Sequence, residues 1–198
     1  LWYELSIESP GFQATGACLP GVPGVVIGRN RTSAWGVTAT MLVSSDLYAE
    51  ELHPSDPSRY RAGDDWLPFE EERQTIAVRG RPSEQIVVHQ TRHGPLISDV
   101  APGDRTALAL RWAGAEVGDD VQALLGVGRA ATWREFRDAL RHLVTPSLNC
   151  LYADVSGTIG YQLAGRYPVR EGGGMVPIAG ATATEWRGYI PVSYTHLT

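Results

Sequence analysis

The segment PGVPGVVIGRNRTSAWGVTAT, residues 20–40, decides the expected fold. Its apolar run at 24–28 carries no charge and is rich in β-branched residues, which is typical of a strand covered on both faces in a stacked sheet. The polar residues 29–33 have the length of a hairpin connection, and a second strand opens at Ala34. Gly36 and the small residues after it leave room for close approach to the backbone, either by a ligand or by tight strand packing.

Composition favours a folded globular protein. The chain has 198 residues, 43% of them hydrophobic, and a formal net charge of −5. A negative charge disfavours nucleic acid as a partner, because phosphate binding needs a basic surface. The sequence has no apolar run of about 18 residues, so we expect no membrane span. Residues 1–8 alternate like a strand and do not resemble a signal peptide, so the chain is expected to be a fragment that starts within a strand.

The rest of the chain predicts mostly strands. They are expected at 1–8, 12–19, 46–53, 74–79, 84–92, 106–112, 148–155 and 158–163. Loops are expected at 54–73, with one short extended piece at 66–69, and at 94–104. A short helix pair interrupts them. Asp119 or Asp120 is expected to cap the first helix, and Thr132 with Glu135 forms a capping box for the second, which Pro146 stops. Strands and helices without βαβ alternation indicate the α+β class.

The two cysteines, Cys18 and Cys150, allow two interpretations. They are expected as small core residues, and in an oxidising compartment they could instead be bridged. No spacing of Cys and His suggests zinc.

Several motifs follow one another in a recognisable order and spacing between residues 1 and 191. They are PGVPGVVIGRNRTSAWGVT (20–38), DLYAEEL (46–52), RHGPLI (92–97), NCLYADVSG (149–157), GY (160–161), GRYPVR (165–170) and EWRGYIP (185–191). Together they resemble the penicillin acylase (penicillin amidase) family of N-terminal-nucleophile hydrolases. The resemblance implies a four-layer αββα sandwich, of which residues 1–191 supply a large-subunit part. The tail VSYTHLT, residues 192–198, does not fit the resemblance and is expected to be foreign or divergent.

The resemblance also implies the chemistry. The nucleophile of the family is a serine at the N-terminus of the large subunit, freed by autocleavage, with its own α-amino group as base. That serine would precede Leu1, so the fragment itself is expected to be inactive. Asn149 matches the asparagine whose side-chain amide donates to the oxyanion, and Ala39 matches the backbone N–H donor. Without the resemblance, Asn149 would be read as an asparagine bonding its own strand. Arg170 matches an arginine near the nucleophile, or else forms a surface ion pair.

Substrate and metal contacts are implied in the same way. Ile27, Val37 and Met41 match positions that line an acyl pocket, although ordinary core packing explains apolar residues equally well. Asp46 matches a ligand of a structural calcium ion, but a second ligand position, three residues earlier, is Val43. Asp46 could instead be ion-paired or capping. No cofactor is required for the chemistry. His93 lies in a turn and is expected to be structural.

The predicted function is hydrolysis of a linear, non-peptide amide through a serine acyl-enzyme. One alternative is an acyl-homoserine lactone or cephalosporin acylase of the same superfamily, and another is a β-rich binding or scaffold module without catalysis. The partners implied are a small-molecule amide, the missing small subunit and the rest of the large subunit, with no nucleic acid and no membrane. A periplasmic or secreted location is implied by the resemblance.

Overall fold

A computed structural model describes residues 2–100, 103–171, 174–183 and 185–197, which form two compact units. Each unit is described by itself. The first comprises Leu1–Ser44, Ala113–Val169 and Gly188–Thr198, and the second comprises Ser45–Trp112 and Arg170–Arg187. Strands with two α-helices confirm the expected α+β class. Within the described residues, we find no helix that is both long enough and apolar enough to cross a membrane.

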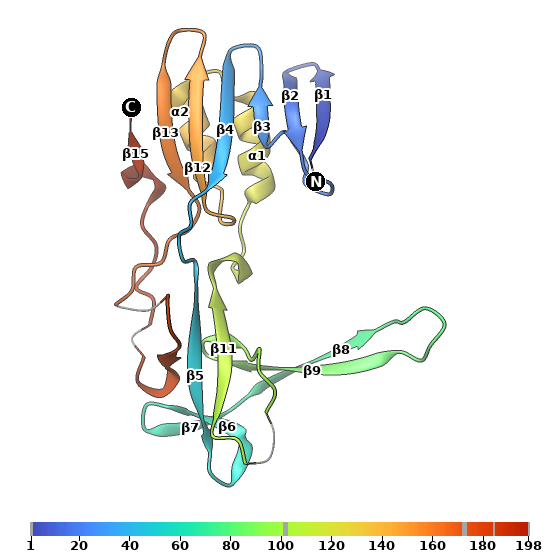
Figure 1. Ribbon diagram of the computed structural model, residues 1–198, viewed down its shortest axis with the longest axis vertical. Helices are drawn as coiled ribbons and strands as arrows, with labels where there is room; N and C mark the ends of the chain where they lie inside the picture. Colours follow the sequence, from blue (N-terminus) through green and yellow to red (C-terminus); the bar gives the residue numbers. More distant parts are fainter. Residues whose placement is uncertain (1, 101–102, 172–173, 184, 198) are drawn as a thin grey trace. The chain divides into compact units, whose positions relative to one another are not determined.

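The first unit is built on a seven-stranded antiparallel sheet in the order β1-β2-β3-β4-β12-β13-β15 (Figure 1). The strands are β1 (Tyr3–Ser9), β2 (Phe12–Cys18), β3 (Ile27–Arg29), β4 (Ser33–Ala39), β12 (Leu148–Asp154), β13 (Ile159–Ala164) and β15 (His196–Leu197). The polar connection after Arg29 joins β3 to β4 as a hairpin, as predicted, with Arg29 opposite Ala34. The hairpin predicted around Ser156 and Gly157 is also confirmed between β12 and β13.

Two helices, α1 (Asp120–Arg129) and α2 (Trp133–Leu140), lie against one face of this sheet (Figure 1). Thr132 is confirmed as the N-cap of α2, because its Oγ1 accepts from the Glu135 N–H at 3.3 Å. The Glu135 carboxylate closes the box one residue early, since it accepts from the N–H of Ala131 at 2.8 Å. At α1, by contrast, the Asp119 side chain makes no capping bond. The side chain of Asp120 instead accepts from the N–H groups of Val144 and Thr145, so it ties down the segment after α2.

The second helix ends earlier than predicted. Its last residue is Leu140, and the chain then tightens, because the N–H groups of His142 and Leu143 bond to carbonyls three residues back. Such three-residue bonds close the last turn of many helices. Leu143 still reaches the core, so the apolar pattern of the sequence marks burial beyond the helix itself.

The core of the first unit lies between this sheet face and the helices. Trp133 and Phe136 of α2 pack against Tyr152 of β12, with ring centroids 5.4 and 5.0 Å from that of the tyrosine. Cys18 and Cys150 are both buried in this core as free thiols, which confirms the core reading over the disulfide. Burial raises the pKa of the Cys150 thiol to about 12.

The strand expected at 24–28 is corrected by the structure. Val25 and Val26 are buried as expected, but β3 begins only at Ile27. Gly24 has φ +108, which interrupts the extended backbone before the strand. The helices cover one face of the sheet, and its other face is open in the described residues, where Leu151 and Ile159 are 54% and 75% exposed. The first unit therefore supplies one sheet and one helical layer of the expected sandwich.

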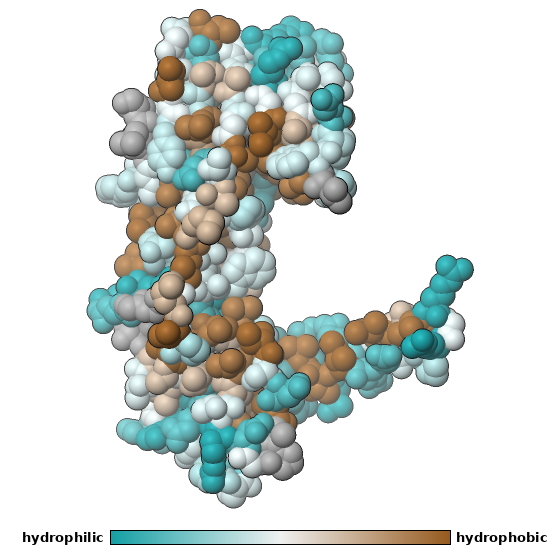
Figure 2. Space-filling model, in the orientation of Figure 1, coloured by the Kyte–Doolittle hydropathy of each residue, from teal (hydrophilic) through white to brown (hydrophobic). Residues whose placement is uncertain are grey.

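The second unit contains a sheet in the order β11-β5-β6-β7, with β14 paired to β5, and a smaller sheet in the order β10-β9-β8. Its strands are β5 (Ser45–His53), β6 (Asp56–Ala62), β7 (Asp65–Pro68), β8 (Glu70–Ile76), β9 (Glu84–Thr91), β10 (Gly94–Pro95), β11 (Thr106–Trp112) and β14 (Ile178–Ala179). Figure 2 shows apolar residues along the β8–β9 hairpin, where Ile76, Ile86 and Val87 are exposed.

The loop expected at 54–73 is wrong for most of its length, because this segment forms the hairpin of β6 and β7 and the start of β8. The extended piece expected at 66–69 overlaps β7. The polar composition of 54–73 led to a wrong prediction because the two strands, like the turn between them, are mostly exposed. Gly63 takes φ +63 between the two strands, and Tyr60 alone anchors β6 as a buried side chain.

Residues 192–197 of the tail belong to the first unit. The 3₁₀ turn Val192–Tyr194 leads to β15, which pairs with β13. The buried amide of Gln162 donates to Val192 O and to Thr195 Oγ1, both at 2.8 Å. The tail thus forms the last strand of this sheet.

Candidate functional site

Asn149 lies on the open face of the seven-stranded sheet. Cys150 and Tyr152, one and three residues further along β12, are buried against the helices. Because successive side chains of a strand point to opposite faces, Asn149 and Leu151 point away from the helices. The register places Asn149 opposite Thr38 of β4.

The amide of Asn149 is held by three neighbours. Its Nδ2 donates to Thr38 Oγ1 at 3.0 Å and to the carbonyl oxygen of Ala39 at 3.2 Å. Its Oδ1 accepts from the hydroxyl of Tyr161 at 2.8 Å. The structure therefore brings together two of the predicted catalytic residues, Asn149 and Ala39, on adjacent strands.

The backbone N–H of Ala39 points away from β12. The Thr40 N–H donates to Ser147 O at 3.4 Å, so Thr40 and Ser147 form a hydrogen-bonded pair of the antiparallel ladder. The next pair, Ala39 and Leu148, is then a non-hydrogen-bonded pair. In such a pair the N–H group of each residue points away from the partner strand. On that side β3 pairs with β4 only at Trp35 and Ala34. The Ala39 N–H therefore points toward the β3 side of β4, at a position where β3 no longer pairs with β4.

The left-handed backbone of Met41 lies two residues after Ala39. Its φ of +56 is the one positive value for a residue other than glycine in the described part of the chain. Strained backbone of this kind concentrates at functional sites, which makes the end of β4 a candidate for such a site.

The three predicted substrate residues lie in different surroundings. Ile27 pairs with Ala17, and the next residue of β2, Cys18, is buried in the core. Because side chains alternate along a strand, Ala17 and its partner Ile27 lie on the open face with Asn149. Val37 packs instead against the helix-facing core, and Met41 is 90% exposed. The structure therefore places Ile27 on the face of Asn149 and Val37 in the core, and a shared acyl pocket stays a prediction.

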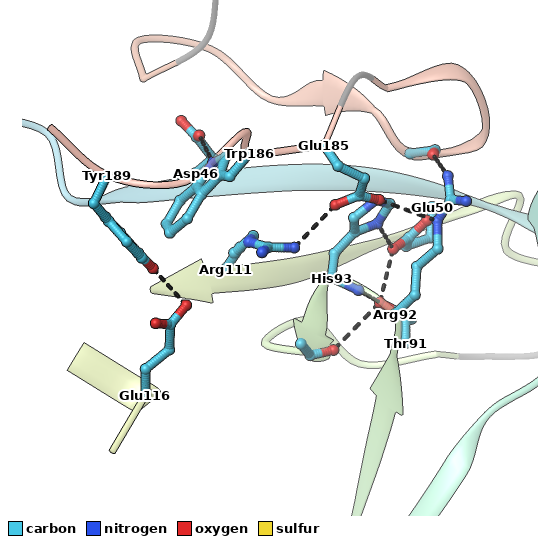
Figure 3. Close-up of polar contacts among 12 residues, drawn as sticks. Asp46, Glu50, Thr91, Arg92, His93, Arg111, Glu116, Glu185, Trp186 and Tyr189 are labelled. Atoms are coloured by element: carbon cyan, nitrogen blue, oxygen red, sulfur yellow. Dashed lines mark hydrogen bonds and ion pairs between the residues drawn. The ribbon is translucent and has the colours of Figure 1, made fainter. Parts of the chain in front are cut away.

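Arg170 and Asp46 meet in the second unit. The Arg170 guanidinium lies 3.2 Å from Asp46 Oδ2, and the side chains are 9% and 0% exposed, so this is a buried ion pair. The indole N–H of Trp186 donates to the same oxygen at 2.7 Å (Figure 3). The Arg111 guanidinium lies over the Trp186 ring, 4.7 Å from its centroid.

These residues alone do not suffice for calcium. Calcium takes six to eight oxygens, and Asp46 offers Oδ1, which is buried without a hydrogen-bond partner in the described structure. Its Oδ2 is already engaged by a cation and an indole N–H. Among the described residues, no group of three or more His, Cys, Asp or Glu is placed to hold a metal ion. A calcium site here would need ligands from elsewhere, and calcium stays a prediction.

A buried histidine network completes the polar centre of the second unit. His93 Nδ1 lies 2.7 Å from Glu50 Oε1, and its Nε2 lies 3.0 Å from Glu185 Oε1 (Figure 3). Glu185 also pairs with Arg111 at 2.9 Å. Burial, with the carboxylates of Asp46 and Glu185 nearby, raises the pKa of Tyr48, whose ring stacks on His93.

Sequence reasoning missed three contributors to these clusters. Thr38 and Tyr161 flank Asn149, and their signal was available, because period-two alternation puts them on the face of Asn149 once the strands are aligned. Glu185 joins His93 across 92 positions of sequence, and no local pattern announces such a contact.

Comparison with known proteins identifies the family. The Penicillin amidase family model matches residues 1–195. The chain is 35% identical to the acyl-homoserine lactone acylase QuiP of Pseudomonas aeruginosa, over 96% of this chain and 24% of that protein. It is 31% identical to the penicillin G acylase of Escherichia coli, over 96% of this chain and 22% of that protein.

A solved structure agrees with the sequence comparisons. The thermostable penicillin G acylase from Alcaligenes faecalis superposes with a TM-score of 0.87 at 29% identity, covering 99% of this chain and 37% of that one. The family model and the structural match thus place the chain among acylase-type hydrolases. The chain belongs to the penicillin amidase family. It spans about a quarter of the length of the curated relatives it matches.

Proposed function

We propose that the protein containing this chain hydrolyses a linear, non-peptide amide through a serine acyl-enzyme. In this proposal the Asn149 amide and the Ala39 N–H stabilise the oxyanion of the tetrahedral intermediate. The observation that supports it is the adjacency of the two residues at the end of β4 and the start of β12, where the Asn149 amide donates to the carbonyl oxygen of Ala39 at 3.2 Å. Donors placed in advance where charge develops are worth about 2.7–4 kcal/mol each in acyl transfer.

The proposal assigns a rearrangement to Asn149. Both of its N–H groups have acceptors here, Thr38 Oγ1 and Ala39 O. An incoming oxyanion must replace or share one of them. Thr38 is the better group to give way, because its hydroxyl can rotate and donate instead, whereas the Ala39 carbonyl can only accept. A charged acceptor also forms the stronger hydrogen bond.

The nucleophile is proposed to come from polypeptide outside these residues. The family resemblance points to a serine whose α-amino group serves as base, and a free α-amine has a pKa near 8, suited to that task. We propose accordingly that the 198-residue chain alone does not turn over amides. The rest of the polypeptide would supply the attacking hydroxyl and the remaining walls of the site.

The test uses the full-length protein. Asn149→Ala is expected to lower kcat about 10²- to 10³-fold, because a donor to the oxyanion is lost. Gln74→Ala serves as the matched control: it also removes a side-chain amide, from the exposed β8 strand, and is expected to leave kcat unchanged. Wild-type turnover in Asn149→Ala would refute the oxyanion role, and absence of any amidase activity in the wild type would refute the function.

A second candidate function is cleavage of N-acyl-homoserine lactones. It is favoured by the 35% identity to a relative that bears that name, above the 31% to a penicillin G acylase. The aliphatic Ile27 on the face of Asn149 suits an alkyl chain as well as an aromatic ring. Initial rates on phenylacetyl and straight-chain acyl p-nitroanilides and on acyl-homoserine lactones of several chain lengths would separate the two.

A further inference from the structure

We propose that Tyr161 is a positioning residue for the Asn149 amide; this inference rests on the oxyanion role proposed above. The Tyr161 hydroxyl donates to Asn149 Oδ1 at 2.8 Å. Tyr161 sits on β13, which pairs with β12, and the register places it opposite Leu151, two residues along from Asn149. It is therefore a diagonal neighbour on the same face, a distance that an aromatic side chain spans.

The amide has two possible orientations, and its neighbours select one. The Ala39 carbonyl accepts and cannot donate, so it requires the nitrogen of Asn149 on the β4 side. Oδ1 then faces β13, where it needs a donor. Tyr161 supplies one, and its O–H is the one donor to Oδ1 found among the described residues. The two contacts from opposite strands hold the N–H groups of Asn149 toward β4, the strand that carries the Ala39 N–H.

Without the tyrosine hydroxyl, one side of this arrangement is lost. Oδ1 would have no donor, and the amide could rotate about its last side-chain bond, which is a soft torsion in asparagine. The N–H groups would spend less time toward the oxyanion position. The loss would affect the transition state, in which the oxyanion forms, more than substrate binding.

The role differs from a merely structural one. Tyr161 is half-buried on the open face of the sheet, whereas Tyr152 is buried on the helix side of the neighbouring strand and donates to Asp154 Oδ2 at 3.0 Å. Removing either hydroxyl deletes one hydrogen bond of similar length. Only the first deletion touches Asn149.

The experiment is a double-mutant cycle in the full-length protein, with steady-state turnover of an acyl p-nitroanilide that the wild type cleaves. Tyr161→Phe is expected to lower kcat about three- to tenfold, the worth of one hydrogen bond, with KM unchanged. Added to Asn149→Ala, it is expected to change kcat no further, because its effect passes through that side chain. Tyr152→Phe, the matched control, is expected to retain wild-type kcat.

Each outcome decides between the two ideas. Wild-type kcat in Tyr161→Phe, or an undiminished loss when Tyr161→Phe is added to Asn149→Ala, would overturn the positioning role while leaving the oxyanion role intact. An Asn149→Ala protein as fast as the wild type would overturn the oxyanion role, and the positioning role would fall with it. Equal losses in Tyr161→Phe and Tyr152→Phe would mean a general weakening of the sheet and would also overturn the proposal.

Discussion

His93 lies flat against Tyr48, with ring centroids 3.8 Å apart and an angle of 5° between the planes. Its ring nitrogens reach Glu50 on one side and Glu185 on the other. Glu50 is fully buried, and one of its oxygens packs directly against Gly180, where an added Cβ would meet it at 2.1 Å. The histidine thus connects β5, the turn after β9 and the segment after β14 within one unit.

His93→Ala should be strongly destabilising. It removes a hydrogen-bond partner of the buried Glu50 side chain, and leaving a buried polar group unsatisfied costs about 1–3 kcal/mol. The cavity left by the buried ring adds to that cost. Glu185→Gln should cost less than about 1 kcal/mol, since Glu185 is 44% exposed and water can replace its contacts. Thermal unfolding of the two variants of the full-length protein checks this order. Similar midpoints for both would contradict the structural role of His93.

Arg170→Ala should destabilise the second unit for the same reason. Among the described residues, the buried Asp46 carboxylate would then keep the Trp186 indole as its one donor to Oδ2. The expected cost is about 3–5 kcal/mol. Arg59→Ala removes an exposed pair with Asp56 and should cost less than about 1 kcal/mol. If Arg170→Ala unfolds at the temperature of the wild type, the ion pair contributes no stability.

Calcium can be tested at the same carboxylate. Because a guanidinium already neutralises Asp46, we expect chelation by EDTA to leave the unfolding temperature of the full-length protein unchanged. A ligand that binds the folded state stabilises it by RT ln(1 + [L]/Kd), so bound calcium would be visible as a shift. A rise in midpoint with millimolar calcium that disappears in Asp46→Asn would establish the metal site instead.

Two glycines of the seven-stranded sheet should respond in opposite ways to alanine. A Cβ on Gly16 would meet the backbone oxygen of Ile27 at 2.1 Å, whereas a Cβ on Gly36 would meet nothing within 4 Å. Gly16→Ala should therefore cost about 1–3 kcal/mol or more through overpacking. Gly36→Ala should be neutral or stabilising by up to about 1 kcal/mol, because glycine weakens a strand. Urea midpoints of the two variants compare them directly.

Alkaline pH should destabilise the first unit. Burial, with the Asp154 carboxylate beside it, raises the pKa of Tyr152 to about 12. Between about pH 10, where an unfolded tyrosine ionises, and pH 12, the folded state holds a proton that the unfolded state releases. Stability therefore falls as pH rises through this window, by up to about 1.4 kcal/mol per pH unit for this group.

The buried thiol of Cys150 extends the pH range of this destabilisation to lower pH. Burial raises the pKa of Cys150 from 9.0 to about 12, so its contribution to stability is lost from about pH 9. Urea midpoints between pH 8 and 12 should fall in the wild type and fall less steeply in Tyr152→Phe and in Cys150→Ala. Parallel curves for all three proteins would contradict the linkage.

Much of the first unit could be predicted because its information is local. The alternation in β1, the hairpin turns and the helix N-cap at Thr132 were each predicted from a few neighbouring residues. The second unit was harder. Its β6–β7 hairpin is mostly exposed, so polar residues occupy positions where alternation would otherwise mark a strand, and the segment resembled a loop.

By itself, the sequence determined the α+β class and the family, because short-range patterns and motif order carry that information. It favoured core positions for both cysteines without deciding between free thiols and a bridge. It also pointed to Asn149 and Ala39 through their motifs. Only the tertiary structure decided that Tyr161 and Thr38 flank the Asn149 amide, and that His93 lies between Glu50 and Glu185. These contacts depend on strand register and on residues that are distant along the chain, and a one-residue shift of register would put each strand residue on the other face.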